Sequence, residues 1–180
     1  MYREVLTILG LGFVALLAMS APQYDRDAWK HWTDADGDCQ DTRQEVLLEE
    51  AEQVALDGDC KVIVGKWRDP YSGETLYDPA YIDIDHMIPL KEAWRSGGWN
   101  WSAAKRERFA NDLDHTDHLV ATHRTWNRSK RDKPPQLWMP PDESTWCWYS
   151  GAWLDEKRLH GLRMTVEEAE FVFGLLDGCD

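Results

Sequence analysis

Apolar side chains at helical spacing mark the first regular element of the chain, between Thr42 and Gly58. Thr42, with Glu45 three residues later, fits a capping box, and Gly58 fits the end of a helix. The apolar stripe between them consists of Val46, Leu47, Ala51, Val54 and Ala55. Two strands are expected next, at residues 61–67 (KVIVGKW) and 81–85 (YIDID), because the first resembles a strand in composition and the second alternates apolar and acidic positions.

Turn and cap residues divide the rest of the chain into short elements. DPYSG at 69–73 predicts a tight turn, Pro89 ends the second strand, and Ser102 and Thr165 are each placed to cap a helix. Helical segments are expected at residues 92–97, 102–113, 124–131, 154–162 and 166–176, and a third strand at 118–122 (HLVAT). Strands and helices do not alternate as βαβ units would, so the pattern favours a mostly helical α+β fold over a doubly wound sheet.

The N-terminus carries an apolar run at residues 5–19, which is shorter than the roughly 18–20 residues that a membrane-spanning helix needs. Ala18 and Ser20 are small residues that fit a signal-peptidase site before Ala21. We therefore expect residues 1–20 to be a signal peptide and residues 21–180 to be one secreted or periplasmic domain. An uncleaved membrane anchor is the alternative.

Four cysteines follow this segment, and none lies in the C-x-x-C spacing of a zinc knuckle. An even number in an exported chain predicts disulfides, and four cysteines can pair in three ways. We favour Cys39–Cys60 and Cys147–Cys179, because each pair would close a helix-containing loop and hold one end of the domain. Free buried thiols are the alternative.

The composition fits one soluble domain whose charge is unevenly distributed. The 180 residues are 43% hydrophobic and carry a net charge of −13, so the field of the whole chain repels polyanions. Residues 86–133 nevertheless contain ten basic and six acidic side chains, which gives this segment a charge of +4 and the remainder −17. Such a segment is compatible with a phosphate-binding cleft, and a solvated helix face is the alternative.

Four side chains around this basic segment are suited to chemistry. Asp85 and His86 end the second strand, His118 begins the third, and Asn127 lies on the helix that follows. Carboxylate and amide oxygens are ligands for hard divalent cations, and a neutral imidazole can take a proton from water. Two strands and a helix can bring the four side chains to one point.

These residues lie in motifs that resemble the HNH nucleases. DHMIPL resembles the family's first strand and loop, and HLVATHRTWNRSK resembles its second strand and helix. The closest likeness is to the C-terminal domain of GmrSD-type restriction enzymes and to small secreted proteins of that branch. It extends over residues 29–179 and is strongest at 81–140. The resemblance implies a ββα-metal core at about 81–133 within a single α+β domain.

The resemblance also implies roles for individual residues. Asp85 and Asn127 would bind one divalent ion, Mg²⁺ or Mn²⁺, and His86 would be the general base that activates water. His118 stands where the family usually has the Asn that orients this base. An imidazole there can replace the amide as a hydrogen-bond partner, or it can join the metal shell and favour a softer ion.

The implied function is a secreted, metal-dependent endonuclease that hydrolyses phosphodiester bonds in DNA, and in RNA as a second substrate. Four basic residues are candidates for binding substrate phosphates: Lys130 and Arg128 on the helix, and more weakly Lys91 and Arg95. The acidic chain predicts weak binding and rapid turnover. No stable protein partner is implied, and no membrane contact is expected after the signal is removed.

Two alternatives remain open. Asp34, Asp36 and Asp38 resemble a calcium loop and are candidates for a structural Ca²⁺, although the Gly that an EF-hand needs is displaced, and an acidic loop before a helix would look the same. The whole chain could instead be a secreted Ca²⁺-binding or nucleic-acid-binding module with a non-catalytic HNH fold. A binding module tolerates the loss of His86, whereas an enzyme does not.

Overall fold

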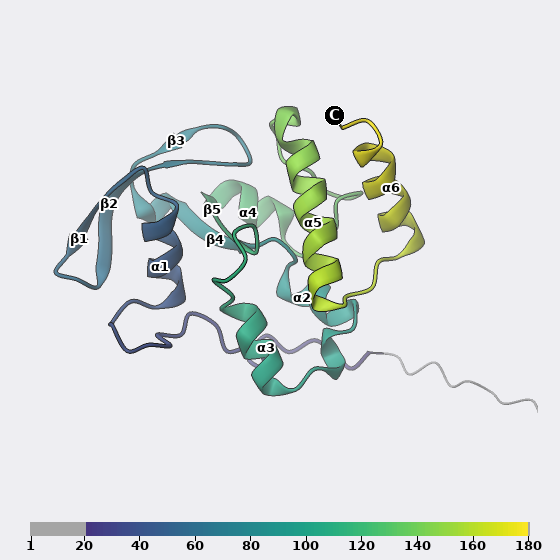
Figure 1. Cartoon of the computed structure of the whole chain (residues 1–180), viewed down its shortest axis with the longest axis horizontal. Helices are drawn as coiled ribbons and strands as arrows, with labels where there is room; N and C mark the ends of the chain where they lie inside the picture. The colour runs from purple at the N-terminus through teal and green to yellow at the C-terminus, as the bar shows by residue number, and fades with distance from the viewer. Residues whose placement is uncertain (1–20, 180) are drawn as a thin grey trace, which may run out of the picture.

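The computed structural model describes residues 21–179, so the predicted signal peptide lies outside the described part. Within it, six α-helices surround small antiparallel sheets (Figure 1). The helices are α1 (Thr42–Glu49), α2 (Leu90–Arg95), α3 (Ala103–Ala110), α4 (Arg124–Lys130), α5 (Trp146–His160) and α6 (Val166–Leu176). The strands are β1 (Gln53–Asp57), β2 (Lys61–Arg68), β3 (Thr75–Leu76), β4 (Ile82–His86) and β5 (Leu119–His123). Among the described helices none is long and apolar enough to cross a membrane.

Strands β1, β2 and β3 form one sheet at one side of the molecule, and β4 and β5 form a separate pair near its centre (Figure 1). The central pair is antiparallel, with Asp85 opposite Val120 and His86 opposite Leu119. α4 follows β5 directly, so β4, β5 and α4 make a ββα unit. The predicted α+β class is confirmed, and both central strands and α4 lie within one residue of their predicted bounds.

The central strands separate two apolar clusters because side chains alternate along a strand. Ile82 and Ile84 pack into the cluster that contains α1 and Trp67. Asp83 and Asp85, on the other face, reach toward α4, where their carboxylates meet Arg128 and Lys130. The YIDID alternation therefore places two carboxylates beside the helix of the ββα unit.

The predicted helix over residues 42–58 is wrong in its second half. Asp41 rather than Thr42 is the N-cap, since its carboxylate accepts the Gln44 backbone N–H, and α1 ends at Glu49. The chain continues as β1, which pairs with β2 around Gly58, a residue at φ +60°. Asp57-Gly58 is a hairpin sequence, and pairing with a neighbouring strand outweighed the helical spacing of two apolar residues.

Other boundaries moved for similar reasons. α5 begins at Trp146, eight residues before the predicted start, because Tyr149 and Trp153 pack fully buried in the core and hold a segment whose own helix propensity is weak. α3 begins after the predicted Ser102 cap but ends at Ala110 rather than 113. α6 keeps its predicted bounds, with a capping box between Thr165 and Glu168.

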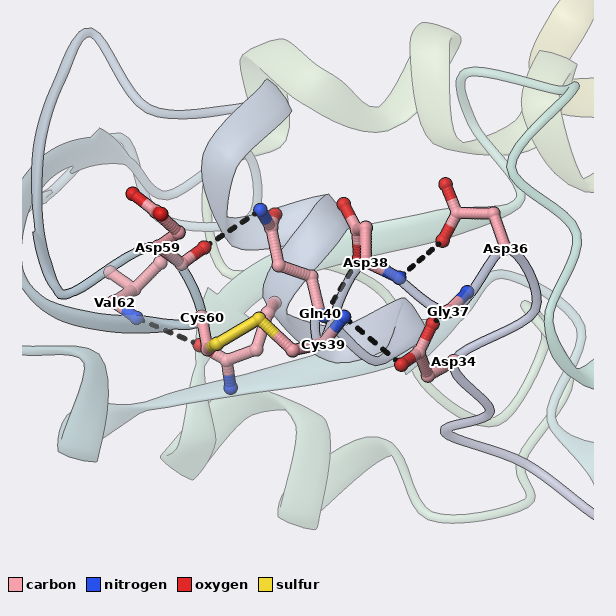
Figure 2. The surroundings of a disulfide bond; sticks show 10 residues. Asp34, Asp36, Gly37, Asp38, Cys39, Gln40, Asp59, Cys60 and Val62 are labelled. Atoms are coloured by element: carbon pink, nitrogen blue, oxygen red, sulfur yellow. Dashed lines mark hydrogen bonds between the residues drawn. A yellow bond between two sulfur atoms is a disulfide. The ribbon is translucent and has the colours of Figure 1, made fainter.

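Both predicted disulfides are present. Cys39–Cys60 attaches the acidic loop before α1 to the β1–β2 hairpin, as Figure 2 shows. Cys147–Cys179 joins the first turn of α5 to the segment after α6. The described cysteines include no free thiol.

Glu50 gives the stability of the fold a pH dependence. Its two carboxyl oxygens each lie 3.1 Å from the Ala121 amide nitrogen of β5. Burial raises the pKa of Glu50 to about 8, against the opposing effect of that N–H. A raised carboxyl pKa means that stability is fully present below the unfolded pKa of about 4.3 and is lost as the pH rises through 8.

We expect Glu50→Gln to be more stable than the parent protein by about 1–2 kcal/mol at pH 8, because the amide still accepts the Ala121 N–H without carrying a charge. The difference should vanish near pH 4. Urea unfolding at several pH values measures it, and Glu74→Gln, at an exposed glutamate that does not contribute to the Glu50 shift, is the control. A difference that does not change with pH would contradict the assignment.

Candidate active site

Asp85 is the carboxylate at the centre of the ββα unit, and it is buried. Its Oδ2 accepts the Tyr71 hydroxyl at 2.7 Å and the Lys130 ammonium at 2.5 Å. Its Oδ1 has no hydrogen-bond partner among the described residues and belongs to a carboxyl group that lines a small pocket. Tyr71 and Lys130 therefore orient the carboxylate and leave one oxygen for a ligand.

Lys130 forms the other half of a buried ion pair. Its side chain is fully buried, and Nζ donates to Asp85 Oδ2 and to the backbone carbonyls of His86 (3.0 Å) and Met87 (2.9 Å). Burial raises the pKa of Asp85 and lowers that of Lys130, and their mutual attraction opposes both shifts. All three partners of Nζ are acceptors, which suits an ammonium with three N–H groups.

His86 is held between aromatic rings with one nitrogen committed. Its ring lies 5.6 Å from that of Trp32 and is stacked on Phe109 at 6.5 Å. Nε2 lies 3.0 Å from the Ala110 carbonyl, which can only accept, so Nε2 carries the proton and Nδ1 the lone pair. Burial, reinforced by His118, lowers the pKa of His86 to about 3, so the ring is a neutral base at pH 7.

Asn127 completes the set on α4. Its Nδ2 faces Asp83 Oδ2 at 3.4 Å, which leaves Oδ1 as the end available to a ligand. A pocket of about 110 Å³ joins these side chains. It is lined by Arg26, Trp32, Ile84, Asp85, His86, Pro89, Leu90, Asn127 and Arg131. Two oxygen ligands, one neutral imidazole and two guanidinium groups thus surround one small opening.

His118 does not line this pocket. It is fully buried, with Nε2 2.6 Å from the Phe109 carbonyl and Nδ1 2.5 Å from Glu156 Oε2. The Phe109 carbonyl is next in the chain to the Ala110 carbonyl that His86 contacts. His118 therefore fixes the backbone that orients His86, and it lies apart from the pocket that contains Asp85 and Asn127.

The four expected phosphate-binding residues are placed differently from the expectation. The expectation that Lys130 binds a substrate phosphate is corrected: Lys130 is buried, and its three acceptors leave no N–H for a substrate. Arg128 is exposed on α4 but pairs with Asp83 at 3.1 Å. Lys91 and Arg95 both pair with Asp132 and do not line the pocket. Of the ten basic residues in segment 86–133, four therefore form ion pairs: Lys91, Arg95, Arg128 and Lys130.

Three residues of the pocket were missed. Arg131 follows Lys130 and has a φ of +57°, a backbone conformation that its sequence does not indicate. Its position among the basic residues after α4 was the only feature of the sequence that pointed to a role in the site. Arg26 and Trp32 come from the N-terminal segment, far from the motifs in sequence. Trp32 also has a positive φ of 58°, a backbone conformation that non-glycine residues adopt mostly where surrounding structure enforces it.

Asp34, Asp36 and Asp38 converge in the loop before α1 (Figure 2). Each offers a carboxylate oxygen within 4.8 Å of the others, a spacing that could hold a cation. The same carboxylates already accept backbone N–H groups within the loop, such as Gly37 to Asp34 at 2.7 Å and Gln40 to Asp38 at 2.8 Å. These bonds explain the folded loop without an ion.

Comparison with known proteins places these residues in a family. Residues 26–158 match the model of the C-terminal domain of GmrSD restriction endonucleases. The chain belongs to that family. All nine residues of the pocket fall inside the matched range, from Arg26 to Arg131. The GmrSD C-terminal domain is nuclease-related, which agrees with a ββα unit carrying Asp, His and Asn.

A fungal protein is also similar to this chain. The chain is 38% identical over 156 residues to a protein of Arthroderma benhamiae described as an uncharacterized secreted protein. The match covers 87% of this chain and 76% of the relative. No solved structure matches the chain.

Proposed function

We propose that this GmrSD-type domain is a secreted, metal-dependent HNH endonuclease that hydrolyses phosphodiester bonds in DNA, with RNA as a second substrate. The observation that supports it most is the single pocket that joins Asp85, His86 and Asn127 to two arginines. The secreted relative, the two disulfides and the apolar N-terminal run support export.

The donor set fits a hard divalent cation. Asp85 Oδ1 and Asn127 Oδ1 are oxygen donors on the same pocket, and Tyr71 and Lys130 hold the carboxylate in place. Mg²⁺ or Mn²⁺ bound there would polarise a phosphoryl oxygen and stabilise charge on the leaving oxygen. Ca²⁺ at the three loop aspartates stays a prediction.

His86 supplies the proton acceptor. A water molecule beside Nδ1 can give up a proton to the lone pair while Ala110 keeps its hydrogen bond to Nε2. The low pKa of about 3 ensures that the base is unprotonated before substrate arrives. A bound phosphodiester anion raises the proton affinity of the imidazole, which brings the base closer to its working range.

Arg26 and Arg131 replace the expected lysine as phosphate ligands. Both line the pocket, and Arg131 forms no salt bridge with any described residue. Trp32 lines the same pocket, with its ring 5.6 Å from that of His86, and is the candidate for stacking with a substrate base. The net charge of −13 on the whole chain repels nucleic acid, which agrees with weak substrate binding.

Arg131→Gln is expected to lower kcat/KM and to reduce the slope of its logarithm against log[salt] by about 0.9, the loss of one phosphate contact. Initial rates of cleavage between 50 and 200 mM salt measure the slope. Arg158→Gln, an exposed arginine on α5, is the matched control and should leave the slope unchanged. If both variants give the same slope, Arg131 does not contact a substrate phosphate.

A plasmid-nicking assay on the oxidised chain of residues 21–180 tests the function. We expect cleavage in Mg²⁺ or Mn²⁺ and none in EDTA, with Ca²⁺, single-stranded DNA and RNA as further arms. Folded protein that cleaves none of these substrates in any ion, yet binds them, would instead support the non-catalytic binding module.

A further inference from the structure

We propose that His118, Glu156 and His160 form a second metal site, selective for Zn²⁺ and separate from the pocket around Asp85. The three residues offer ligand atoms that all lie within 4.8 Å of one another. Two imidazole nitrogens and one carboxylate oxygen are a common ligand set for Zn²⁺, whereas Mg²⁺ prefers oxygen alone.

The distances between the ligand atoms are close to those around a bound ion. Glu156 Oε2 lies 3.1 Å from His160 Nε2 and 2.5 Å from His118 Nδ1. With Zn–N and Zn–O bonds of about 2.0–2.2 Å, two ligands of a tetrahedral ion are about 3.3 Å apart. The His160 contact already meets this spacing, and the His118 contact must open by less than about 1 Å.

The surroundings of the two rings resemble the outer shell of a metal site. His118 Nε2 donates to the Phe109 carbonyl at 2.6 Å, and a second ring nitrogen bonded to a carbonyl is the usual support of a metal-binding histidine. The His160 ring packs against Phe109 at 4.7 Å and against Trp101 at 6.3 Å, which limits its rotation. The ligands are therefore oriented before any ion binds.

In the ion-free protein, the Glu156 carboxylate bridges the two imidazoles, contacting His118 Nδ1 and His160 Nε2. Zn²⁺ bound among the three residues would take the place of these two contacts.

Ions can reach the cluster from solvent. Glu156 lines a depression of about 580 Å³ whose other side chains include Asp114, Asp117 and Asp155, an acidic opening that attracts cations. His160 borders a separate depression of about 730 Å³. Neither depression includes Asp85 or Asn127, so the two metal sites have separate access.

The site would join α5 to the segment that supports the pocket. Glu156 and His160 lie on α5, and His118 contacts the Phe109 carbonyl beside the Ala110 carbonyl that holds His86. Zn²⁺ held by these three side chains, with water as the fourth ligand, would link α5 to this segment. This inference does not depend on nuclease activity.

Calorimetric titration of the chelator-treated, oxidised chain with Zn²⁺ tests the proposal, with 5 mM Mg²⁺ present. We expect one Zn²⁺ per chain in the parent protein and in Asn127→Ala, which removes a ligand of the other metal site and leaves the Asp85–Lys130 pair intact. His160→Ala and Glu156→Gln should each weaken binding at least about 100-fold. His123→Asn is the matched control, because Asn can replace this histidine as the N-cap of α4.

X-ray absorption spectroscopy of the Zn²⁺-loaded parent protein is a second test that needs no variant. We expect its spectrum to show two imidazole nitrogens bound to the ion. The proposal would be overturned if the parent protein binds no Zn²⁺, if the stoichiometry falls to zero in Asn127→Ala, or if the bound ion has no two imidazole ligands. None of these results depends on whether the protein cleaves nucleic acid.

Discussion

Replacing His86 by alanine is expected to lower the rate constant for metal-dependent DNA cleavage by about 10²–10⁴-fold, the usual contribution of a general base. The variant lacks the lone pair of Nδ1, whereas Asp85, Asn127 and both arginines remain in the pocket. KM should change little, because no phosphate contact is removed. Single-turnover cleavage of a labelled duplex in saturating Mg²⁺ measures the effect.

The control for this variant separates chemistry from folding. The His86 ring fills space between Trp32 and Phe109, so His86→Gln, which retains more volume and an amide N–H toward Ala110, is measured beside it. His115→Ala removes a half-exposed histidine outside the pocket and should leave cleavage unchanged. If His86→Gln is folded and cleaves as fast as the parent protein, His86 is not the base.

The ββα unit could be predicted from sequence because local patterns agree there with the tertiary structure. YIDID alternates, HLVAT is a short apolar run, and the helix after it ends near Pro134-Pro135, so all three elements lie close to their expected bounds. The 42–58 segment behaved differently. Its apolar spacing fits a helix, but Asp57-Gly58 also fits a hairpin turn. Residues 53–57 form a strand because they pair with β2, and the spacing of apolar residues within one segment does not reveal such a partner.

The site was predictable only as far as its motifs reach. Asp85, His86 and Asn127 lie in two contiguous motifs, and they do line one pocket. Lys130 belongs to the same motif, but sequence does not reveal that its ammonium points inward to Asp85 rather than outward to a phosphate. Arg26 and Trp32 come from a segment about sixty residues earlier, and only the folded chain brings them to His86.

Replacing Lys130 by methionine is expected to cost about 3–5 kcal/mol of unfolding free energy, because Asp85 would remain as a buried charge without its partner. Urea unfolding at pH 7.5 measures the loss. Lys66→Met, which breaks an exposed ion pair with Glu52, is the matched control and should cost about 0–1 kcal/mol. Loss of less than 1 kcal/mol in Lys130→Met would contradict a buried ion pair.

The loss of stability in Lys130→Met should grow as the pH rises. Burial already raises the pKa of Asp85, and removing Lys130 removes the main opposing charge. A raised carboxyl pKa leaves stability intact below the unfolded value of about 3.9 and lowers it as the pH rises. Lys130→Met should therefore lie closer to the parent protein at pH 4.5 than at pH 7.5.

The double variant separates the two roles of the pair. Adding Asp85→Asn to Lys130→Met removes the buried charge, so we expect it to recover at least about 2 kcal/mol of the lost stability. Cleavage should not recover, because the amide that replaces Asp85 is a poorer ligand for a hard cation than a carboxylate. A folded double variant that cleaves DNA at the parent rate would show that Asp85 supports the fold and not the chemistry.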